Sequence, residues 1–156
     1  MMMLPLLLAA AVPAAAPAPA VSAADAAAVM APLKAWFAGI DALDATAIRN
    51  QIRIDGGGGA TIAVSRPDGT KLVRHITWEA YLANIKPGER HFHEQFTGTP
   101  VIQIDGDIAM VWGDFVLSID GKPATCGVDH FDMVREAGAW KVQNVTWSQR
   151  TTGCAG

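Results

Sequence analysis

Hydrophobic and polar positions alternate along the chain with two different periods. Between residues 25 and 52 the apolar residues recur every three or four positions, which is the spacing of an amphipathic helix. We expect a first helix capped by Asp25 and a short second helix capped by Asp44. The glycines at 56–59 end this region, and because they follow a helix and enter a strand-like segment they predict a loop, not a phosphate-binding motif.

From residue 60 onwards the dominant period is two, which is typical of strands. Residues 60–65 and 70–76 flank a turn and predict a hairpin, and Thr77 then begins a helix that stops at Pro87. The remainder predicts antiparallel strands, at 91–96 with a continuation through 101–104, and at 108–119, 124–135 and 140–150. The order indicates an α+β fold, in which a curved antiparallel sheet wraps around N-terminal helices to form a cone with an internal pocket.

The N-terminus predicts an export signal. Its apolar core and the small residues before Asp25 suit removal by signal peptidase, although no Lys or Arg precedes the core. We therefore expect a signal peptide at 1–23, one domain at 24–156, and a periplasmic or secreted protein. The only two cysteines, Cys126 and Cys154, permit one disulfide in such a compartment. The alternative is a buried Cys126 and a free thiol in the tail.

Charge and composition exclude two classes of partner. The formal net charge is −3, and the 12 Lys and Arg residues are scattered, so no basic stripe is available to neutralise phosphates. Beyond the leader no apolar run is long enough to cross a bilayer. We expect neither nucleic acid nor, after signal cleavage, a membrane as partner.

The order of elements and four short motifs resemble the nuclear transport factor 2-like superfamily, with its SnoaL-like and ketosteroid-isomerase-like branches nearest. The motifs are IDGDIAMVW at 104–112, DGKP at 120–123, CGVDHF at 126–131 and GAWK at 138–141. The resemblance spans about 26–150 and implies the cone fold and a homodimer formed through the outer sheet face. It leaves the function open, because the superfamily includes isomerases, cyclases, dehydratases, hydrolases, lyases and binding domains.

The resemblance implies that Asp129 is the first candidate for catalysis. The related isomerases and cyclases carry an acidic residue facing the cavity from the penultimate strand, and a pocket tryptophan near the end of the last strand, where this chain has Trp147. Alternation places Asp129 and Phe131 on one face. Apolar neighbours would raise the pKa of Asp129 and suit it to proton transfer. The alternative is a structural aspartate, hydrogen-bonded to the backbone or to His130.

Two departures from the isomerase pattern argue against steroid isomerisation. The position of the general base on the first strand corresponds to Val64, and the phenol of the first helix corresponds to Trp36. A SnoaL-like site loses less, because it needs one aspartate and no cofactor. We expect Trp36, Phe115, Phe131 and Trp147 to hold the ligand.

The histidines give a second set of candidates. His91 and His93 point to the same side of a predicted strand and Glu94 to the other. A His-x-His pair can bind a metal, but no further ligand is well placed except His130, so we predict no metal. His93 or His130 could instead assist Asp129 in proton transfer.

The sequence therefore predicts a cofactor-independent acid/base enzyme of the isomerase, cyclase or lyase type. Its substrate would be a small aromatic or polycyclic compound bound in a hydrophobic pocket. The alternative is a non-catalytic domain of the cell envelope that binds a small ligand or another protein.

Overall fold

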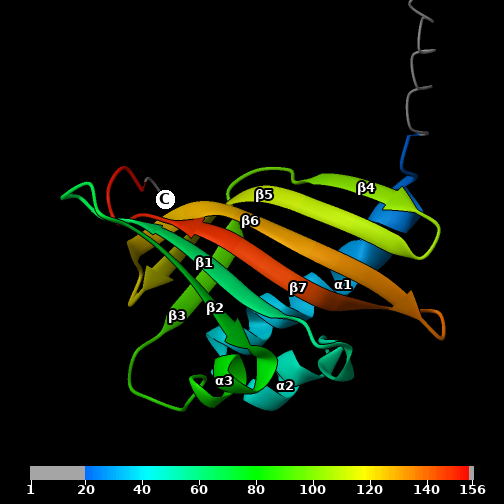
Figure 1. Ribbon diagram of the computed structural model, residues 1–156, viewed down its shortest axis with the longest axis horizontal. Helices are drawn as coiled ribbons and strands as arrows, with labels where there is room; N and C mark the ends of the chain where they lie inside the picture. Colours follow the sequence, from blue (N-terminus) through cyan, green and yellow to red (C-terminus); the bar gives the residue numbers. More distant parts are fainter. Residues whose placement is uncertain (1–19, 155–156) are drawn as a thin grey trace, which may run out of the picture.

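One curved sheet of seven strands forms the frame of the computed structural model, which describes residues 20–154 (Figure 1). The strands are β1 (Gly59–Ser65), β2 (Lys71–Thr77), β3 (Phe92–Phe96), β4 (Val101–Asp105), β5 (Ile108–Ile119), β6 (Lys122–Glu136) and β7 (Ala139–Gln149). Their order is β2-β1-β7-β6-β5-β3, with β4 also paired to β5. The predicted α+β cone is confirmed. The sheet is mixed, however, because β1 pairs with β7 in parallel while every other pairing is antiparallel.

Three helices accompany the sheet: α1 (Ala23–Asp41), α2 (Ala45–Arg49) and α3 (Trp78–Ala83), with a 3₁₀ turn at Ile54–Gly56. The caps expected for α2 and α3 are confirmed, because Asp44 accepts hydrogen bonds from two backbone N–H groups and Thr77 accepts one. The cap of α1 is Ser22, which accepts a hydrogen bond from the backbone N–H of Asp25 at 3.1 Å. Asp25 lies instead in the first turn, where its charge suits the helix dipole.

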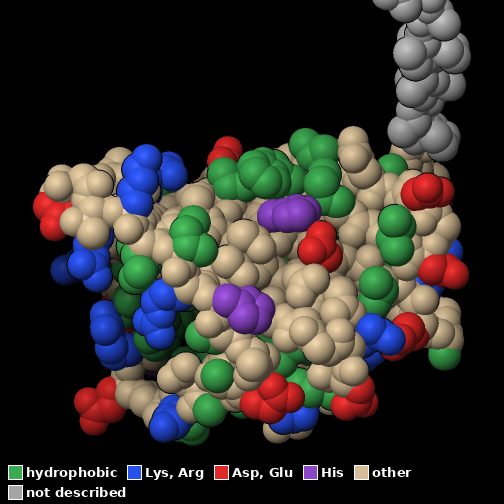
Figure 2. Space-filling model, viewed as in Figure 1, with side chains coloured by type: hydrophobic (Ala, Val, Ile, Leu, Met, Phe, Trp, Pro, Cys, Tyr) green, Lys and Arg blue, Asp and Glu red, His purple; other side chains and the backbone are tan. Residues whose placement is uncertain are grey.

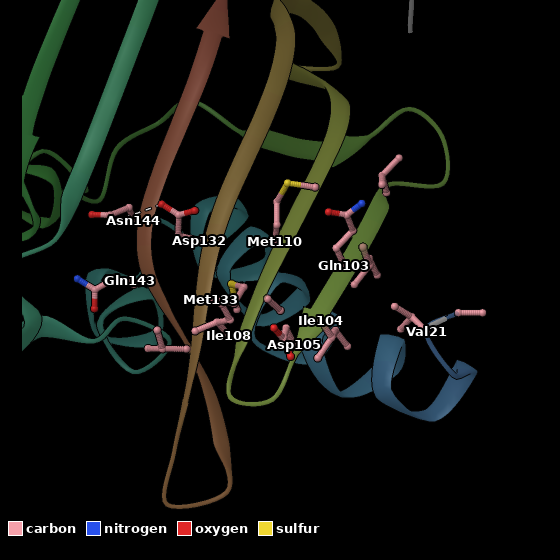
Figure 3. A pocket seen from close by; sticks show the side chains of 15 residues that line it. Val21, Gln103, Ile104, Asp105, Ile108, Met110, Asp132, Met133, Gln143 and Asn144 are labelled. Carbon is pink, nitrogen blue, oxygen red and sulfur yellow. Dashed lines mark hydrogen bonds between the residues drawn. The ribbon is translucent and has the colours of Figure 1, made fainter. Parts of the chain in front are cut away.

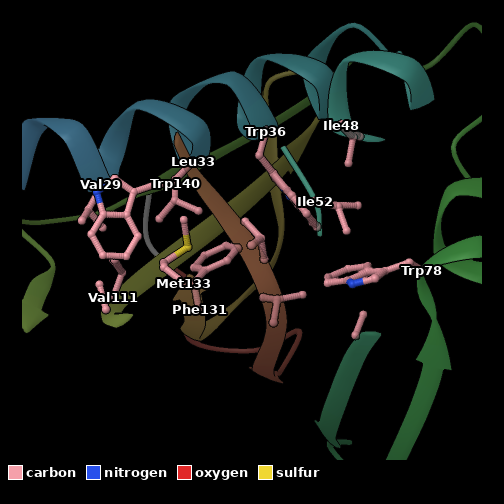
Figure 4. Packing of buried hydrophobic residues seen from close by; sticks show 14 of the residues in the cluster. Val29, Leu33, Trp36, Ile48, Ile52, Trp78, Val111, Phe131, Met133 and Trp140 are labelled. Atoms are coloured by element: carbon pink, nitrogen blue, oxygen red, sulfur yellow. The ribbon is translucent and has the colours of Figure 1, made fainter. Parts of the chain in front are cut away.

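The hydrophobic core lies between α1 and the face of the sheet that α1 covers, which we call the inner face (Figure 4). Val29, Leu33 and Trp36 on α1 are buried there. Side chains of β5, β6 and β7 meet them from the sheet, among them Val111, Phe131, Met133 and Val142. Trp36 has edge-to-face contacts with Trp78 and Phe131, at centroid distances of 5.6 and 5.9 Å. These contacts fix α1 across the sheet.

The C-terminal tail returns to the sheet and is joined to it. Cys126 on β6 forms a disulfide with Cys154, with Cα atoms 5.5 Å apart. This decides between the two interpretations of the cysteines. Alternation turns Cys126 away from the inner face, so the tail is attached on the outer side.

The predicted signal peptide falls almost entirely on residues 1–19, which lie outside the described residues, so its removal stays a prediction. Within residues 20–154, no helix combines the length and apolarity needed to cross a membrane.

Candidate functional site

A cavity of about 230 Å³ lies between the inner face of the sheet and helices α1 and α3. Six aromatic side chains line it: Trp36, Tyr81, Phe92, Phe115, Phe131 and Trp147. The four residues expected to hold a ligand are all among them. Two carboxyl groups, from Asp129 and Glu94, complete the polar part of the wall together with Asn84, Thr125 and Gln149. The cavity therefore combines apolar walls with a few polar groups, as ligand sites usually do.

Asp129 lies in the middle of β6 and faces this cavity. Its register partners are Gly113 on β5 and Trp147 on β7, so it sits on the inner face as alternation predicted. It is 2% exposed, and its Oδ2 atom has no hydrogen-bond partner. Burial, and then the charge of Glu94, raise the pKa of Asp129 well above its usual range. The structural alternative is disfavoured, because neither the backbone nor His130 satisfies this oxygen.

Glu94 is the second carboxyl group of the site, and sequence analysis did not select it. It lies on β3 between Phe92 and Phe96, and these three residues share the inner face. Burial, and then the charge of Asp41, raise the pKa of Glu94 to about 7. The alternation of Glu94 with two phenylalanines was the signal that could have identified it, because an acidic residue on an apolar strand face is seldom solvated.

Tyr81 on α3 places a phenol in the cavity, a group that the first helix lacks. Its ring lies 5.3 Å from that of Trp36, and it lines the same cavity. Burial, followed by the charges of Glu94 and Asp129, raises the pKa of Tyr81 well above 10. The hydroxyl therefore stays protonated and can donate a hydrogen bond.

His93 and His130 lie outside the cavity. The ring of His93 is on the outer side of β3, where its Nδ1 atom lies 2.8 Å from Oδ2 of Asp41, and this hydrogen bond raises the pKa of His93. His130 follows Asp129 on β6 and so faces outward, with Nε2 3.5 Å from Oδ1 of Asp132. Because side chains alternate along a strand, the structure brings neither imidazole to Asp129. Glu94 and Tyr81 share the cavity with it instead.

The lining contains no Lys, Arg or His side chain. The described part of the chain also contains no group of three His, Cys, Asp or Glu residues arranged to hold a metal ion. His91 precedes β3 and His93 lies on it, and both side chains are exposed. Among the described residues, no side chain of the lining therefore offers Asp129 or Glu94 a positive charge.

A wider groove of about 730 Å³ is lined by β4, β5 and β6, by two residues of β7 and by the segment that precedes α1, where Val21 lies (Figure 3). Its polar groups have partners or are exposed, and Asp132 is partnered by Asn144 at 3.4 Å and by His130. Hydrophobic side chains gather on the outer face of the sheet (Figure 2), where Trp112 and Ile108 are 49% and 60% exposed. The groove holds no unpartnered buried polar group of the described chain, so the inner cavity is the stronger candidate.

Comparisons with known proteins agree on the fold. No family model matches the sequence, and no curated protein matches it either. Among solved structures, an NTF2-like protein of unknown function from Shewanella baltica is 15% identical, with a TM-score of 0.59, covering 85% of this chain and 98% of that one. An NTF2-like protein from Cytophaga hutchinsonii is 14% identical, with a TM-score of 0.60 and coverages of 83% and 100%.

A third similar structure comes from Novosphingobium aromaticivorans and is provisionally described as an aromatic ring hydroxylase. It is 17% identical, with a TM-score of 0.59 and coverages of 85% and 96%. At these identities the likeness concerns the fold alone. The chain therefore has the fold of the nuclear transport factor 2-like superfamily.

Proposed function

We propose that the inner cavity is the active site of a cofactor-independent acid/base enzyme that transfers a proton to or from a small aromatic compound. The observation that carries the proposal is the pair of carboxyl groups, Asp129 and Glu94, which share one apolar cavity. Asp129 has an oxygen with no hydrogen-bond partner in the protein, and burial raises the pKa of Glu94 to about 7. Burying such groups costs free energy, and buried carboxyl groups with raised pKa values are common in active sites.

In this proposal Glu94 acts as the general base, and Asp129 acts as the protonated hydrogen-bond donor. Each raises the cost of ionising the other, so they lose their protons at different pH values. Because the pKa of Glu94 is about 7, its carboxylate is available near neutral pH to accept a proton from the substrate. Asp129 keeps its proton and, with Tyr81, can donate hydrogen bonds to an oxygen that gains negative charge.

The size of the cavity limits the substrate. An apolar cavity of about 150 Å³ is enough to bind benzene. The present cavity of about 230 Å³ suits one substituted ring or two fused rings, and not a four-ring compound. An anionic substrate is disfavoured as well, because the lining has two acidic groups and no basic one.

A model reaction tests the proposal without the natural substrate. The Kemp elimination of 5-nitro-1,2-benzisoxazole requires a base to remove the proton on carbon 3 while the N–O bond breaks, which gives a coloured phenolate. We expect turnover above the buffer rate at pH 8, and a loss of about 10²- to 10⁴-fold in Glu94→Gln. Asp129→Asn should also be slower, because it alters the donor to the leaving oxygen. Exposed Glu89 supplies the matched control, Glu89→Gln.

The non-catalytic alternative gives a different result in the same experiment. If the benzisoxazole binds but the wild type and both cavity variants turn it over at the buffer rate, the cavity is a binding site without acid/base function. If Asp129→Asn and Glu94→Gln both match the wild-type turnover, the rate arises elsewhere and the assignment of these two residues is wrong.

Export and self-association stay predictions. The Cys126–Cys154 disulfide supports an oxidising compartment, which is consistent with a periplasmic or secreted protein. The exposed apolar side chains on the outer sheet face, including Trp112, support the expected homodimer. Analytical ultracentrifugation of the wild type and Trp112→Ser tests that expectation, since a dimer formed through this face should weaken in the variant.

A further inference from the structure

We propose that the ligand of the inner cavity carries an ammonium group on one or two apolar rings, with the ammonium beside the carboxyl of Glu94 and the rings among the aromatic side chains. This deepens the proposed function by naming a substrate class, and it rests on that function for the choice of cavity. Its test measures binding alone, so it can succeed or fail independently of turnover.

The first argument is the charge of the site. Two carboxyl groups lie in a cavity whose lining includes no Lys, Arg or His side chain. Neither Asp129 nor Glu94 has a side-chain hydrogen bond or salt bridge within the described chain, and Oδ2 of Asp129, in a residue 2% exposed, has no partner. An ammonium group has three N–H donors and a positive charge, and so supplies both things that these carboxyl groups lack.

The second argument is the aromatic wall. The faces of Trp, Tyr and Phe rings attract cations, and this attraction is strongest where water is excluded. The six aromatic side chains of the lining surround the same space that the carboxyl groups face. An amine on an apolar ring can therefore bury its hydrocarbon part while its positive charge lies near the faces of aromatic rings and near the carboxyl groups. An anion of equal size gains only the apolar contact and meets two acidic groups.

The third argument is the set of charged and titratable groups around Glu94. Asp41 lies at the C-terminal end of α1, and its Oδ1 atom accepts a hydrogen bond from the backbone N–H of Glu94 at 3.3 Å. The other charged or titratable groups around Glu94 are Asp129 from β6 and Tyr81 from α3, with His93 beside Asp41. Asp41, Glu94 and Asp129 are acidic and only His93 is basic, so acidic groups outnumber basic ones around Glu94. Such surroundings favour a cation over an anion.

Binding of the ammonium group releases one proton. In the free protein below pH 7 the Glu94 carboxyl is protonated. The ammonium ion displaces that proton to solvent and forms an ion pair with the resulting carboxylate, so the charge within the cavity is unchanged at zero. No covalent bond is formed, and no other reactant is required. Affinity for an amine should therefore increase with pH until Glu94 is already ionised.

Three matched probes test the proposal: 2-phenylethylamine, which is a cation at neutral pH, neutral 2-phenylethanol, and anionic 3-phenylpropionate. Isothermal titration calorimetry on the full chain at pH 7.5 should show the amine binding at least tenfold more tightly than the alcohol, and the anion binding weakest. Between pH 5 and pH 6 the amine affinity should increase about tenfold, while the alcohol affinity stays constant. Repeating the pH 6 titration in buffers of different ionisation enthalpy should show close to one proton released.

Two variants at acidic positions complete the test. Glu94→Gln should lose the preference for the amine and its pH dependence while still binding 2-phenylethanol, which also shows that the cavity is folded. Glu89→Gln, at an exposed position outside the cavity, should behave as the wild type. The proposal is overturned if the alcohol binds as tightly as the amine at pH 7.5, or if Glu94→Gln keeps the amine preference. Turnover of the benzisoxazole in the same preparations would leave the proposed acid/base function standing in either case.

Discussion

Asp41 and Glu94 are joined directly: Oδ1 of Asp41 accepts a hydrogen bond from the backbone N–H of Glu94 at 3.3 Å. The other carboxylate oxygen of Asp41 binds the ring of His93 at 2.8 Å. One exposed carboxylate thus connects an imidazole in solvent to a carboxyl group in the cavity. Its charge is the second cause, after burial, of the raised pKa of Glu94.

Asp41→Asn should therefore lower the pKa of Glu94 below about 7, because an amide keeps an oxygen for the N–H group but removes the charge. His93→Gln should act in the opposite direction below the pKa of His93, because it removes the positive partner of Asp41. Carbon-detected NMR titration of the Glu94 carboxyl measures both effects. Equal values in the wild type and Asp41→Asn would show that burial alone sets this pKa.

Stability should fall as the pH increases from 4.5 to 7. Glu94 keeps its proton up to a pKa of about 7 in the folded protein, whereas in the unfolded chain its pKa is near 4.5. Between these two pKa values the folded state therefore binds more protons than the unfolded chain. The stabilisation that this gives is lost as pH increases. The difference corresponds to about 3 kcal/mol in the free energy of unfolding. Urea denaturation at several pH values measures the slope, which should be shallower in Glu94→Gln but not zero, because burial also raises the pKa of Asp129.

Asp129→Leu should stabilise the protein at pH 7 by about 1–3 kcal/mol, because folding no longer buries a carboxyl group with an unpartnered oxygen. Asp132→Leu is the matched control on the outer face of the same strand. There the carboxylate is paired, so the change should be neutral or destabilising. Thermal unfolding of the two variants checks the difference. A destabilised Asp129→Leu would mean that the carboxyl group contributes to the fold.

Gly127→Ala should distort the strand next to Asp129. A Cβ atom at this position would lie 1.9 Å from the carbonyl oxygen of Ser148, which is backbone and cannot move aside. Overpacking of this kind costs about 1–3 kcal/mol. Gly88 has no atom within 4 Å of such a Cβ, so Gly88→Ala should leave the melting temperature nearly unchanged. Equal melting temperatures in the two variants would contradict the close approach of β6 and β7.

The disulfide should contribute to stability and not to the cavity. Linking residues 126 and 154 closes a loop of 28 residues, which corresponds to about 3–4 kcal/mol in the free energy of unfolding. The double variant Cys126→Ser/Cys154→Ser should therefore melt at a lower temperature. Binding of 2-phenylethanol should be unchanged, because Cys126 faces away from the inner face. Lost binding at a temperature where the variant is folded would show that the tail also shapes the cavity.

Most elements could be predicted from the sequence because their signals are local. Asp44 and Thr77 cap their helices as expected, and Asp129 and Phe131 share a face as strand alternation requires. The parallel pairing of β1 with β7 was not predictable in this way. Ala60 and Val145 are register partners although 85 positions separate them, and no local pattern encodes the direction in which such distant strands meet.

The site was predictable only in part, for a related reason. Asp129 was identified through the family resemblance, which implies an acidic residue facing the cavity from the penultimate strand, and strand alternation agreed with it. Glu94 sits beside His93 in a segment with several polar residues, so its burial depends on α1 and α3 packing over that strand face. Tyr81 reaches the cavity through a tertiary contact, its position against Trp36, which no local pattern encodes.

Strand β6 places a carboxyl group and an imidazole at neighbouring positions on opposite faces, with Asp129 inside and His130 outside. A slip of one residue in strand register exchanges the two faces. A single deletion or insertion ahead of Asp129 would turn His130 inward, but it would also turn Phe131 and Met133, each 1% exposed, out of the core. The packing that holds the sheet against α1 therefore also determines which of the two proton-carrying side chains faces the cavity.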